Sequence, residues 1–322
     1  MQVARWSAAE ARAAIASADL DRRIGAAIGV PAVVVDLETG DDGADIAAAL
    51  AALPVIGIST ADHAAADWDL AEPSPDEVLD GVLATPLAAV TTAQTLRRTA
   101  ALPTADGLFV ESIAYATLQG GPEYGAWLAT QGRRTRRDDA PRVRVDDDAG
   151  TAVVTLTRGR LRNLLDARMR DELVDALRAL ALDPGRPIRL VGDGPGFCAG
   201  GDPAEFGSVS DSATAHLIRA SANVAPHLVR VADRTEAIVH GPCIGAGVEL
   251  AAFCSRVVAR PDARFRLPET SMGLMPGAGG TVSIPRRIGR RRTLAWLLRG
   301  DEIDAASAFD WGLVDEIRPD GR

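Results

Sequence analysis

Lysine is absent from this 322-residue chain, whose 35 basic side chains are all arginine. Its absence excludes Schiff-base chemistry on a lysine amine and a phosphate-binding loop that ends in lysine. Basic residues are also outnumbered, because 44 acidic side chains give a formal net charge of −9. Such a chain offers no basic face to replace the counterions of nucleic acid, so we expect no nucleic-acid partner.

Cysteine and histidine are sparse. The three cysteines, Cys198, Cys243 and Cys254, have no CxxC spacing, and the four histidines form no HExxH pair. A disulfide scaffold is therefore excluded, and the thiols are expected to be reduced. We expect no metal site and no bound cofactor.

Long hydrophobic runs are lacking as well. Hydrophobic residues make up 47% of the chain and charged residues 25%, as in ordinary soluble globular proteins. No apolar run approaches the roughly 18 residues needed to span a bilayer. The first 23 residues contain acidic side chains and no signal-peptide core. These features predict a cytoplasmic protein with a substantial core and no membrane contact.

The first half alternates between strand and helix patterns. Residues 30–37 and 54–59 are short apolar runs suited to buried strands. Helical patterns cover 8–28, 44–52, 87–99 and 105–130. This alternation predicts a βαβ arrangement followed by helices.

The segment 131–148 is densely charged and divides the chain. Its composition is typical of a solvated connector, although its arginines offer an alternative as contacts for a ligand phosphate. These arginines are Arg133, Arg134, Arg136 and Arg137. We place the domain boundary here, with an N-terminal α/β region over 1–140 and a second unit over 141–322.

The second half combines buried strands with two glycine-rich turns. Strands are predicted over 151–156, 187–192 and 236–241, and helices over 165–181, 212–231 and 290–299. The sequence GDGPGFCAGGD begins at the end of the second of these strands, and GPCIGAG follows the third. Neither turn has the GxGxxG order of a dinucleotide-binding loop.

Small residues in these turns permit close approach of the backbone to a ligand. Backbone N–H groups of Gly201 and Ala246, if they converge, would form an oxyanion hole, and the second would lie at a helix N-terminus. Glu249 follows about one turn into that helix. Glu269 is the other acidic residue in an otherwise apolar, glycine-rich stretch.

Three motifs resemble the signatures of the crotonase superfamily, the enoyl-CoA hydratase/isomerase group. They are GFCAGGD at 196–202, HGPCIGAGVELA at 240–251 and LPETSMGLMPGAGGT at 267–281. The resemblance covers roughly 145–318. It implies a crotonase-type spiral of ββα repeats, an acyl-CoA thioester as substrate, coenzyme A only as part of that substrate, and a homotrimer or dimer of trimers.

The same resemblance assigns roles to residues. It implies oxyanion donors at Gly201 and Ala246 and catalytic carboxylates at Glu249 and Glu269, without deciding which is acid and which is base. Asp202 falls on the family's aspartate after the first donor, and Ala199 near the position that contacts adenine. Further substrate or coenzyme A contacts are expected from Gly200, Gly245, Arg158, Arg160 and Arg162.

The chain departs from the family in the order of its parts. Family members continue for some 60 or more residues beyond the equivalent of GLVDEI, as helices that cover the active site. Residues 84–131 resemble those helices, although they precede the motifs. The N-terminal region is therefore interpreted as a degenerate crotonase half, and we expect 84–131 to close the pocket, in the same subunit or on a neighbour.

Three functions follow from these motifs. The pair of glutamates favours hydration of an enoyl-CoA at its 2,3 double bond. A second hypothesis is another reaction of the same scaffold, as an isomerase, hydrolase, decarboxylase or cofactor-free oxygenase. A third is a non-catalytic acyl-CoA-binding subunit.

Overall fold

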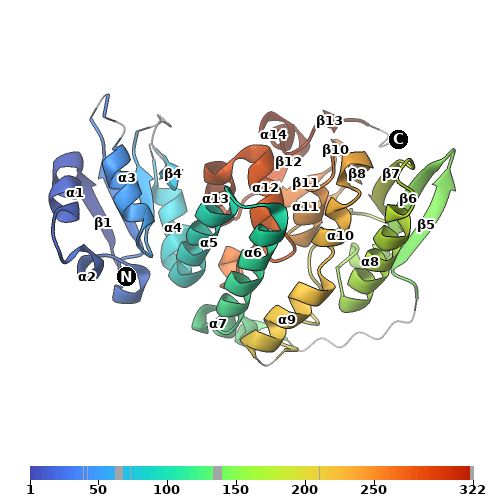
Figure 1. The fold of residues 1–322 in the computed structure, drawn as a ribbon, viewed down its shortest axis with the longest axis horizontal. Coiled ribbons are helices and arrows are strands. Elements are labelled where there is room, and N and C mark those ends of the chain that lie inside the picture. Colours follow the sequence, from blue (N-terminus) through green and yellow to red (C-terminus); the bar gives the residue numbers. More distant parts are fainter. Residues whose placement is uncertain are drawn as a thin grey trace.

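The computed structural model describes residues 1–38, 40–41, 43–61, 68–72, 74–132, 140–209 and 211–319. It is an elongated α/β molecule with a small parallel sheet at one end and a larger sheet at the other (Figure 1). Helices from both halves of the chain lie between the two sheets. The fold therefore contains the α/β N-terminal region that the sequence predicts.

The N-terminal sheet has four parallel strands in chain order: β1 (Val3–Ser7), β2 (Ala32–Asp36), β3 (Ile56–Ser59) and β4 (Leu70–Ala71). The predicted βαβ unit is confirmed, with α3 (Ala44–Ala51) between β2 and β3. Alternate residues of β2 enter two cores, because Val33 and Val35 pack in one cluster and Val34 in another.

The predicted helix over 8–28 is wrong in its continuity. The chain forms α1 (Ala8–Ile15), α2 (Leu20–Arg23) and a 3₁₀ turn at Ala26–Ile28. Gly25, with φ +139°, precedes that turn, and its left-handed backbone cannot continue a helix.

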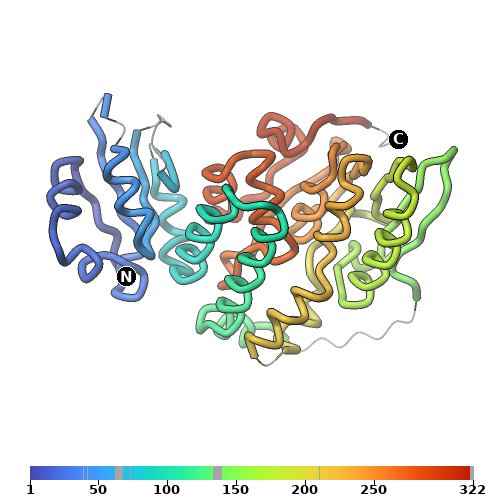
Figure 2. Tube along the Cα trace, viewed as in Figure 1, coloured from blue at the N-terminus to red at the C-terminus, as the bar shows by residue number. Residues whose placement is uncertain are grey.

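Four helices follow: α4 (Asp76–Ala84), α5 (Pro86–Thr99), α6 (Thr104–Gln119) and α7 (Pro122–Thr130). The single helix expected over 105–130 is interrupted at Gly120 and Gly121, and Pro122 begins α7 at a position where proline is favoured. The tube in Figure 2 shows α5 and α6 side by side against the second half. Although they precede the predicted boundary, these helices pack with the chain beyond it.

The larger sheet has six strands, in the order β13-β10-β8-β7-β6-β5. Its strands are β5 (Val143–Asp148), β6 (Thr151–Leu156), β7 (Ile188–Gly192), β8 (Thr235–Val239), β10 (Arg256–Ala259) and β13 (Glu316–Ile317). All neighbours are parallel except β5 and β6, which pair antiparallel.

The connector predicted over 131–148 is thus wrong for its last part. Val143–Asp148 forms the edge strand of a hairpin, and most of its side chains are exposed. Its charges therefore remain in solvent although its backbone is paired. The arginines between 133 and 139 lie outside the described residues.

Between the strands of this sheet the chain forms α8 (Ala167–Ala181), α9 (Ser212–Ala222) and α10 (Ala225–Val229), with 3₁₀ turns at Gly159–Leu161 and Ala232–Arg234. The predicted helix over 212–231 is interrupted at Asn223, whose backbone is extended (φ −76°, ψ 136°). As a result, α9 leaves the sheet and packs against α6.

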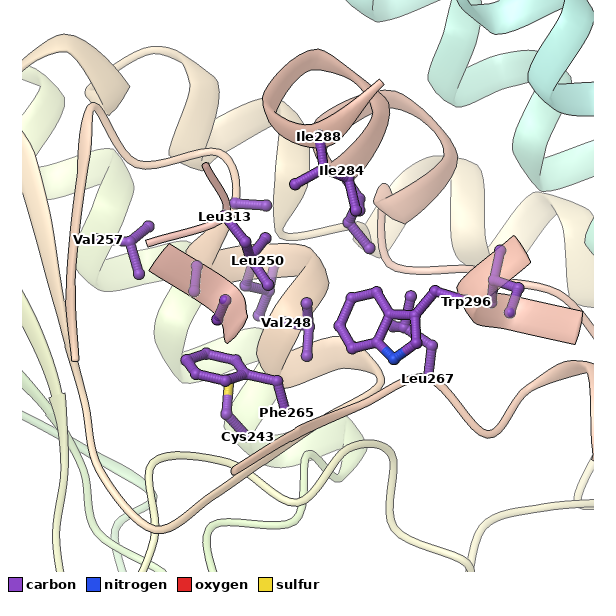
Figure 3. Packing of buried hydrophobic residues seen from close by; sticks show 14 of the residues in the cluster. Cys243, Val248, Leu250, Val257, Phe265, Leu267, Ile284, Ile288, Trp296 and Leu313 are labelled. Carbon is purple, nitrogen blue, oxygen red and sulfur yellow. The ribbon is translucent and has the colours of Figure 1, made fainter. Parts of the chain in front are cut away.

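A three-stranded sheet completes the second half: β9 (Pro242–Ile244), β11 (Arg264–Arg266) and β12 (Glu302–Asp304). The remaining helices are α11 (Ala246–Ala251), α12 (Gly280–Ile288), α13 (Arg290–Arg299), α14 (Ala305–Asp310) and the 3₁₀ turn η4 (Thr270–Met272). On the core side of α11, Val248 and Leu250 belong to the same buried cluster as Phe265 and Leu267 (Figure 3). This packing anchors the elements that carry Glu249 and Glu269.

Candidate active site

Three backbone segments lie side by side at the candidate site. Cys198 N donates to Pro242 O at 3.2 Å, and Ile244 N donates to Cys198 O at 2.9 Å. Gly245 N donates to Arg266 O at 2.9 Å, continuing the pairing of β9 with β11. The three motifs, distant in sequence, thus reach one edge together.

Two backbone N–H groups are free where these segments end. Within the described residues, neither Gly201 N nor Ala246 N has a hydrogen-bond acceptor. Gly200 has φ +90° and Gly245 has φ +51°, so each predicted donor follows a left-handed turn. A Cβ at Gly200 would lie 4.0 Å from Ala246 N, which places the two turns against each other. The pair has the features expected of an oxyanion hole.

Glu249 projects from α11 beside these donors and is 2% exposed. Its Oε2 accepts hydrogen bonds from Ala278 N at 2.7 Å and Gly280 N at 2.8 Å. No described residue bonds to its Oε1. One oxygen therefore fixes the side chain while the other is available for chemistry.

Glu269 follows β11 and faces the second turn. It is 8% exposed, and its Oε2 is buried without a hydrogen-bond partner among the described residues. A Cβ at Gly245 would come within 2.5 Å of Glu269 Oε1, so glycine is required there for this carboxylate to approach the backbone. An unpartnered buried carboxyl oxygen is costly unless a ligand or water satisfies it.

The two glutamates and the two donors border one cavity of about 310 Å³. Apolar side chains supply most of the remaining wall: Leu165, Pro203, Phe206, Ile244, Pro268, Met272 and Leu274. A few convergent polar groups in an apolar cavity are the usual arrangement of a small-molecule site.

Helices from the first half close this cavity. Tyr115 of α6 and Trp127 of α7 line it, and Trp127 packs against Phe206 with ring centroids 5.7 Å apart. Arg219 of α9 is the one basic residue in the described cavity wall. The expected proximity of 84–131 to Glu249 and Glu269 is therefore present within a single chain.

A third buried carboxylate, Glu111 of α6, supports the loop that holds Glu249. It is 1% exposed and accepts bonds from Gly279 N at 2.7 Å and Thr281 N at 2.8 Å. Thr281 Oγ1 also donates to it at 2.7 Å. Ala278 N and Gly280 N bind Glu249, whereas Gly279 N and Thr281 N bind Glu111. Alternate residues of one loop therefore hold the two carboxylates.

Burial raises the pKa of all three carboxyls. The pKa of Glu269 and that of Glu111 are each raised to about 7, in both cases chiefly by desolvation. The pKa of Glu249 is raised well above its ordinary value by desolvation and then by the charges of Glu111 and Glu269. Such a cluster can hold and exchange protons near neutral pH.

The structure separates the other predicted residues into two groups. Ala199, Gly200 and Gly245 line the cavity as expected. Asp202 and Arg158 do not: both are buried and pair with each other at 2.9 Å, and Arg158 also pairs with Asp166 at 3.3 Å. Both side chains are engaged in this ion-pair network outside the described cavity wall, and their contact with substrate stays a prediction.

Arg160 and Arg162 are exposed and lie outside the cavity wall. Arg162 instead accepts the N–H of Ala199 on its backbone carbonyl at 2.8 Å, in a left-handed conformation with φ +52°. Its backbone therefore helps to place the first oxyanion turn.

Sequence reasoning missed Glu111, Tyr115, Trp127 and Arg219. Glu111 is separated from its partners by 168 and 170 residues, and no local pattern connects them. The resemblance of 84–131 to covering helices was the one signal that pointed to this region.

The described residues contain no group of three His, Cys, Asp or Glu side chains arranged to hold a metal ion. The three cysteines are buried free thiols. Within the same described ranges, no helix is long and apolar enough to cross a membrane. Among the described residues, the polar groups that line the cavity are its two carboxyls, its backbone N–H groups, Tyr115 and Arg219.

This geometry defines a site that can stabilise negative charge on a carbonyl oxygen beside two acid–base groups. Comparison with known proteins gives its family: the model for enoyl-CoA hydratase/isomerase matches residues 146–322, more than half of the chain. The chain belongs to the enoyl-CoA hydratase/isomerase, or crotonase, family.

Relatives and solved structures agree over the same part. The chain is 36% identical over 168 residues to a 2,3-dehydroadipyl-CoA hydratase of Escherichia coli, covering 52% of this chain and 65% of that protein. It is 34% identical over 178 residues to a probable enoyl-CoA hydratase of Rhodobacter capsulatus, covering 55% and 69%. The chain thus spans about two thirds of the length of these relatives.

Two solved structures show the same fold in part of the chain. An enoyl-CoA hydratase from Mycobacterium smegmatis matches with a TM-score of 0.51 and 31% identity, over 55% of this chain and 70% of that one. An enoyl-CoA hydratase from Thermoplasma volcanium matches with a TM-score of 0.52 and 28% identity, over 56% and 73%. The C-terminal part therefore has the crotonase-like fold.

Proposed function

We propose that this chain hydrates an enoyl-CoA thioester at its 2,3 double bond. The observation that carries the proposal is the single cavity bordered by two free N–H donors and two buried glutamates. Gly201 N and Ala246 N would bind the thioester oxygen and stabilise the enolate charge that develops on it. Loss of one such donor typically costs roughly 3–4 kcal/mol in the barrier.

The two glutamates would manage the protons. A water held between them adds its oxygen to C3, and an ionised carboxylate accepts the proton that the water loses. The other carboxyl, protonated before the step, donates to C2. The raised pKa values of Glu249 and Glu269 suit this division, because a carboxyl in such a site is able to hold a proton at neutral pH.

The cover of the cavity is part of the proposal. We propose that residues 84–131 take the place of the helices that cover the active site in other family members. Tyr115 and Trp127 support this role, since both lie in the wall of the cavity that contains the glutamates. The division of the chain into units over 1–140 and 141–322 is proposed from the change of composition at 131–148. Assembly as trimers or pairs of trimers is proposed from the family resemblance.

Turnover of crotonyl-CoA and a longer 2-enoyl-CoA, followed by the loss of enoyl absorbance, tests the hydratase proposal. Wild type should hydrate at least one, and Glu249→Gln and Glu269→Gln should each lose roughly 100- to 10,000-fold in kcat, the usual contribution of a general acid or base. Glu302→Gln, at a 55% exposed side chain outside the cavity, is the matched control and should retain activity.

Other reactions of the scaffold would use the same oxyanion hole. Isomerisation, thioester hydrolysis, decarboxylation and cofactor-free oxygenation are distinguished by the product formed. The presence of both glutamates favours hydration among them. Tight binding of acyl-CoA without turnover of either enoyl substrate would argue against the hydratase and favour another reaction or the non-catalytic binding role.

A further inference from the structure

The cavity that contains the glutamates adjoins a second one. The neighbouring cavity is about 170 Å³, and the two share Leu165, Arg219, Gly277 and Ala278 as lining residues. Arg219 therefore lies in the walls of both cavities. Gln119, Asn223 and Arg170 add polar groups to the wall of that second cavity, and Arg170 is paired with Asp171 at 2.8 Å.

Arg219 lies at this junction without a counter-ion. Its guanidinium carbon is 3.9 Å from the centroid of the Tyr115 ring, and it forms no ion pair with any described residue. Nη1 is buried with no acceptor, and Nη2 makes one long bond of 3.4 Å to Gln119 Oε1. By contrast, the buried arginines Arg97, Arg142 and Arg158 each contact a carboxylate.

A partly buried guanidinium without a carboxylate is unfavourable, and an anionic ligand group would remove that cost. Burial also lowers the pKa of Arg219, although this group stays charged at neutral pH. Within the described residues Glu111, Glu249 and Glu269 form no ion pair with Arg219, and burial raises the pKa of each, which reduces their negative charge near neutral pH. A carboxylate bound by Arg219 would supply both charge and paired acceptors.

Resting on the proposed function, we infer that Arg219 selects thioesters whose acyl chain carries a second, distal carboxylate. The substrate class is the coenzyme A monothioester of an unsaturated dicarboxylic acid. Its methylenes would contact apolar wall residues such as Leu165 and Val224, and its carboxylate would pair with Arg219 where the cavities meet.

The catalytic test compares two 2-enoyl-CoA thioesters of equal chain length, one ending in a methyl group and one in a carboxylate. Wild type should prefer the carboxylate by its kcat/KM. Arg219→Met should lose roughly 10- to 100-fold on that substrate, the usual value of a charged hydrogen-bonded pair, and little on the methyl-ended one. Arg219→Lys should retain part of the preference, and Arg178→Met, at an exposed arginine outside both cavities, all of it.

Equal losses on both substrates would overturn the inference, since they would assign Arg219 to general support of the glutamates. A preference that survives Arg219→Met, or no preference in wild type, would also overturn it. Thermal melting of each variant identifies losses that come from misfolding, and Arg219→Lys then decides the question.

A binding measurement distinguishes failure of this inference from failure of the proposed function. Saturated thioesters with and without a distal carboxylate are titrated into wild type and Arg219→Met by calorimetry. Tighter binding of the carboxylate form that is lost in Arg219→Met supports the inference even if wild type hydrates no enoyl-CoA. Equal or absent binding of the two forms by wild type overturns it.

Discussion

Glu111, Glu249 and Glu269 come from three parts of the chain, and the ionisation of one carboxyl affects the pKa of another. Glu249 is affected by the charges of both neighbours, and Glu269 by that of Glu111. Interacting carboxyls lose their protons in steps that belong to the cluster. The number of charges in the cavity near neutral pH is thus set by all three.

The cluster predicts a bell-shaped dependence of kcat/KM on pH. The rate should rise as Glu269, with a pKa raised to about 7, loses its proton, and should fall at higher pH as the last proton leaves Glu249. Glu111→Gln removes one negative charge, which makes ionisation of the other two easier. The rising limb should therefore move to lower pH, and hydration rates measured between pH 5.5 and 9 would show it.

The test depends on the direction in which the rising limb of the pH profile moves. Glutamine is close to glutamate in size and removes the charge, but its single oxygen can replace only one of the two that accept from Gly279 N and Thr281 N. A rising limb that stays in place, or moves to higher pH, would show that the charge of Glu111 does not reach Glu269. A uniform fall in rate at every pH would instead indicate that glutamine misplaces the loop.

Among the elements, α7 is held against η4 by the close contact of Gly273 with Tyr124. Gly273 has φ +72°, and a Cβ there would overlap Tyr124 N and approach Glu123. Gly273→Ala should displace α7 and with it Trp127 in the cavity wall. We expect a lower melting temperature and a several-fold higher KM for the enoyl-CoA, measured by thermal unfolding and steady-state kinetics.

Gly300→Ala is the matched control. Gly300 has φ +66°, ends α13 and has open space where its Cβ would be placed. This variant should lower the free energy of unfolding only by the cost of the left-handed backbone, of order 1 kcal/mol. If both variants unfold at the same temperature with unchanged KM, the contact of α7 with η4 does not shape the cavity.

Strands with a buried apolar pattern were predictable, and elements that depend on distant partners were not. The runs at 30–37, 151–156 and 187–192 correspond to β2, β6 and β7 because both faces of central strands need apolar side chains. Val143–Asp148 has no such pattern, and its pairing is supplied by β6. The breaks at Gly25, at Gly120 and Gly121, and at Asn223 depend on one or two residues within otherwise helical stretches.

The residues of the candidate site also fall into two groups, those that could be predicted from local sequence and those that could not. Gly201, Ala246, Glu249 and Glu269 lie within motifs that can be recognised locally, and all four border the cavity. Glu111 and Arg219 act through contacts across the fold, for which no sequence spacing exists. The burial of Arg158 was not predictable either, because an arginine in a turn gives no indication of burial, which Asp166 and Asp202 make possible by pairing with it.

At the scale of the whole molecule, Asp69 connects the N-terminal sheet to the helices beside it. It is 4% exposed and accepts bonds from Gly57 N at 2.8 Å and Arg97 Nε at 2.7 Å. Arg290 Nη1 of α13 lies 3.5 Å from its Oδ1. One carboxylate thus joins β3, α5 and α13.

Asp69→Ala should lower the free energy of unfolding by about 3 kcal/mol or more, because it leaves two partly buried guanidinium groups without this carboxylate. Chemical denaturation gives the measurement. Asp76→Ala removes an exposed pair with Arg5, with 85% of the Asp76 side chain accessible, and should cost under about 1 kcal/mol. Similar costs for the two variants would show that the buried cluster contributes no more than a surface pair.

The order of parts along the chain has a consequence for biosynthesis. Translation delivers α6 and α7, which contain Glu111, Tyr115 and Trp127, before it delivers Glu249 or Glu269. Segments emerging early from the ribosome are the first able to fold. In this chain α6 and α7 are therefore synthesised before the segments that carry Glu249 and Glu269, and those segments emerge beside helices already available to pack against them.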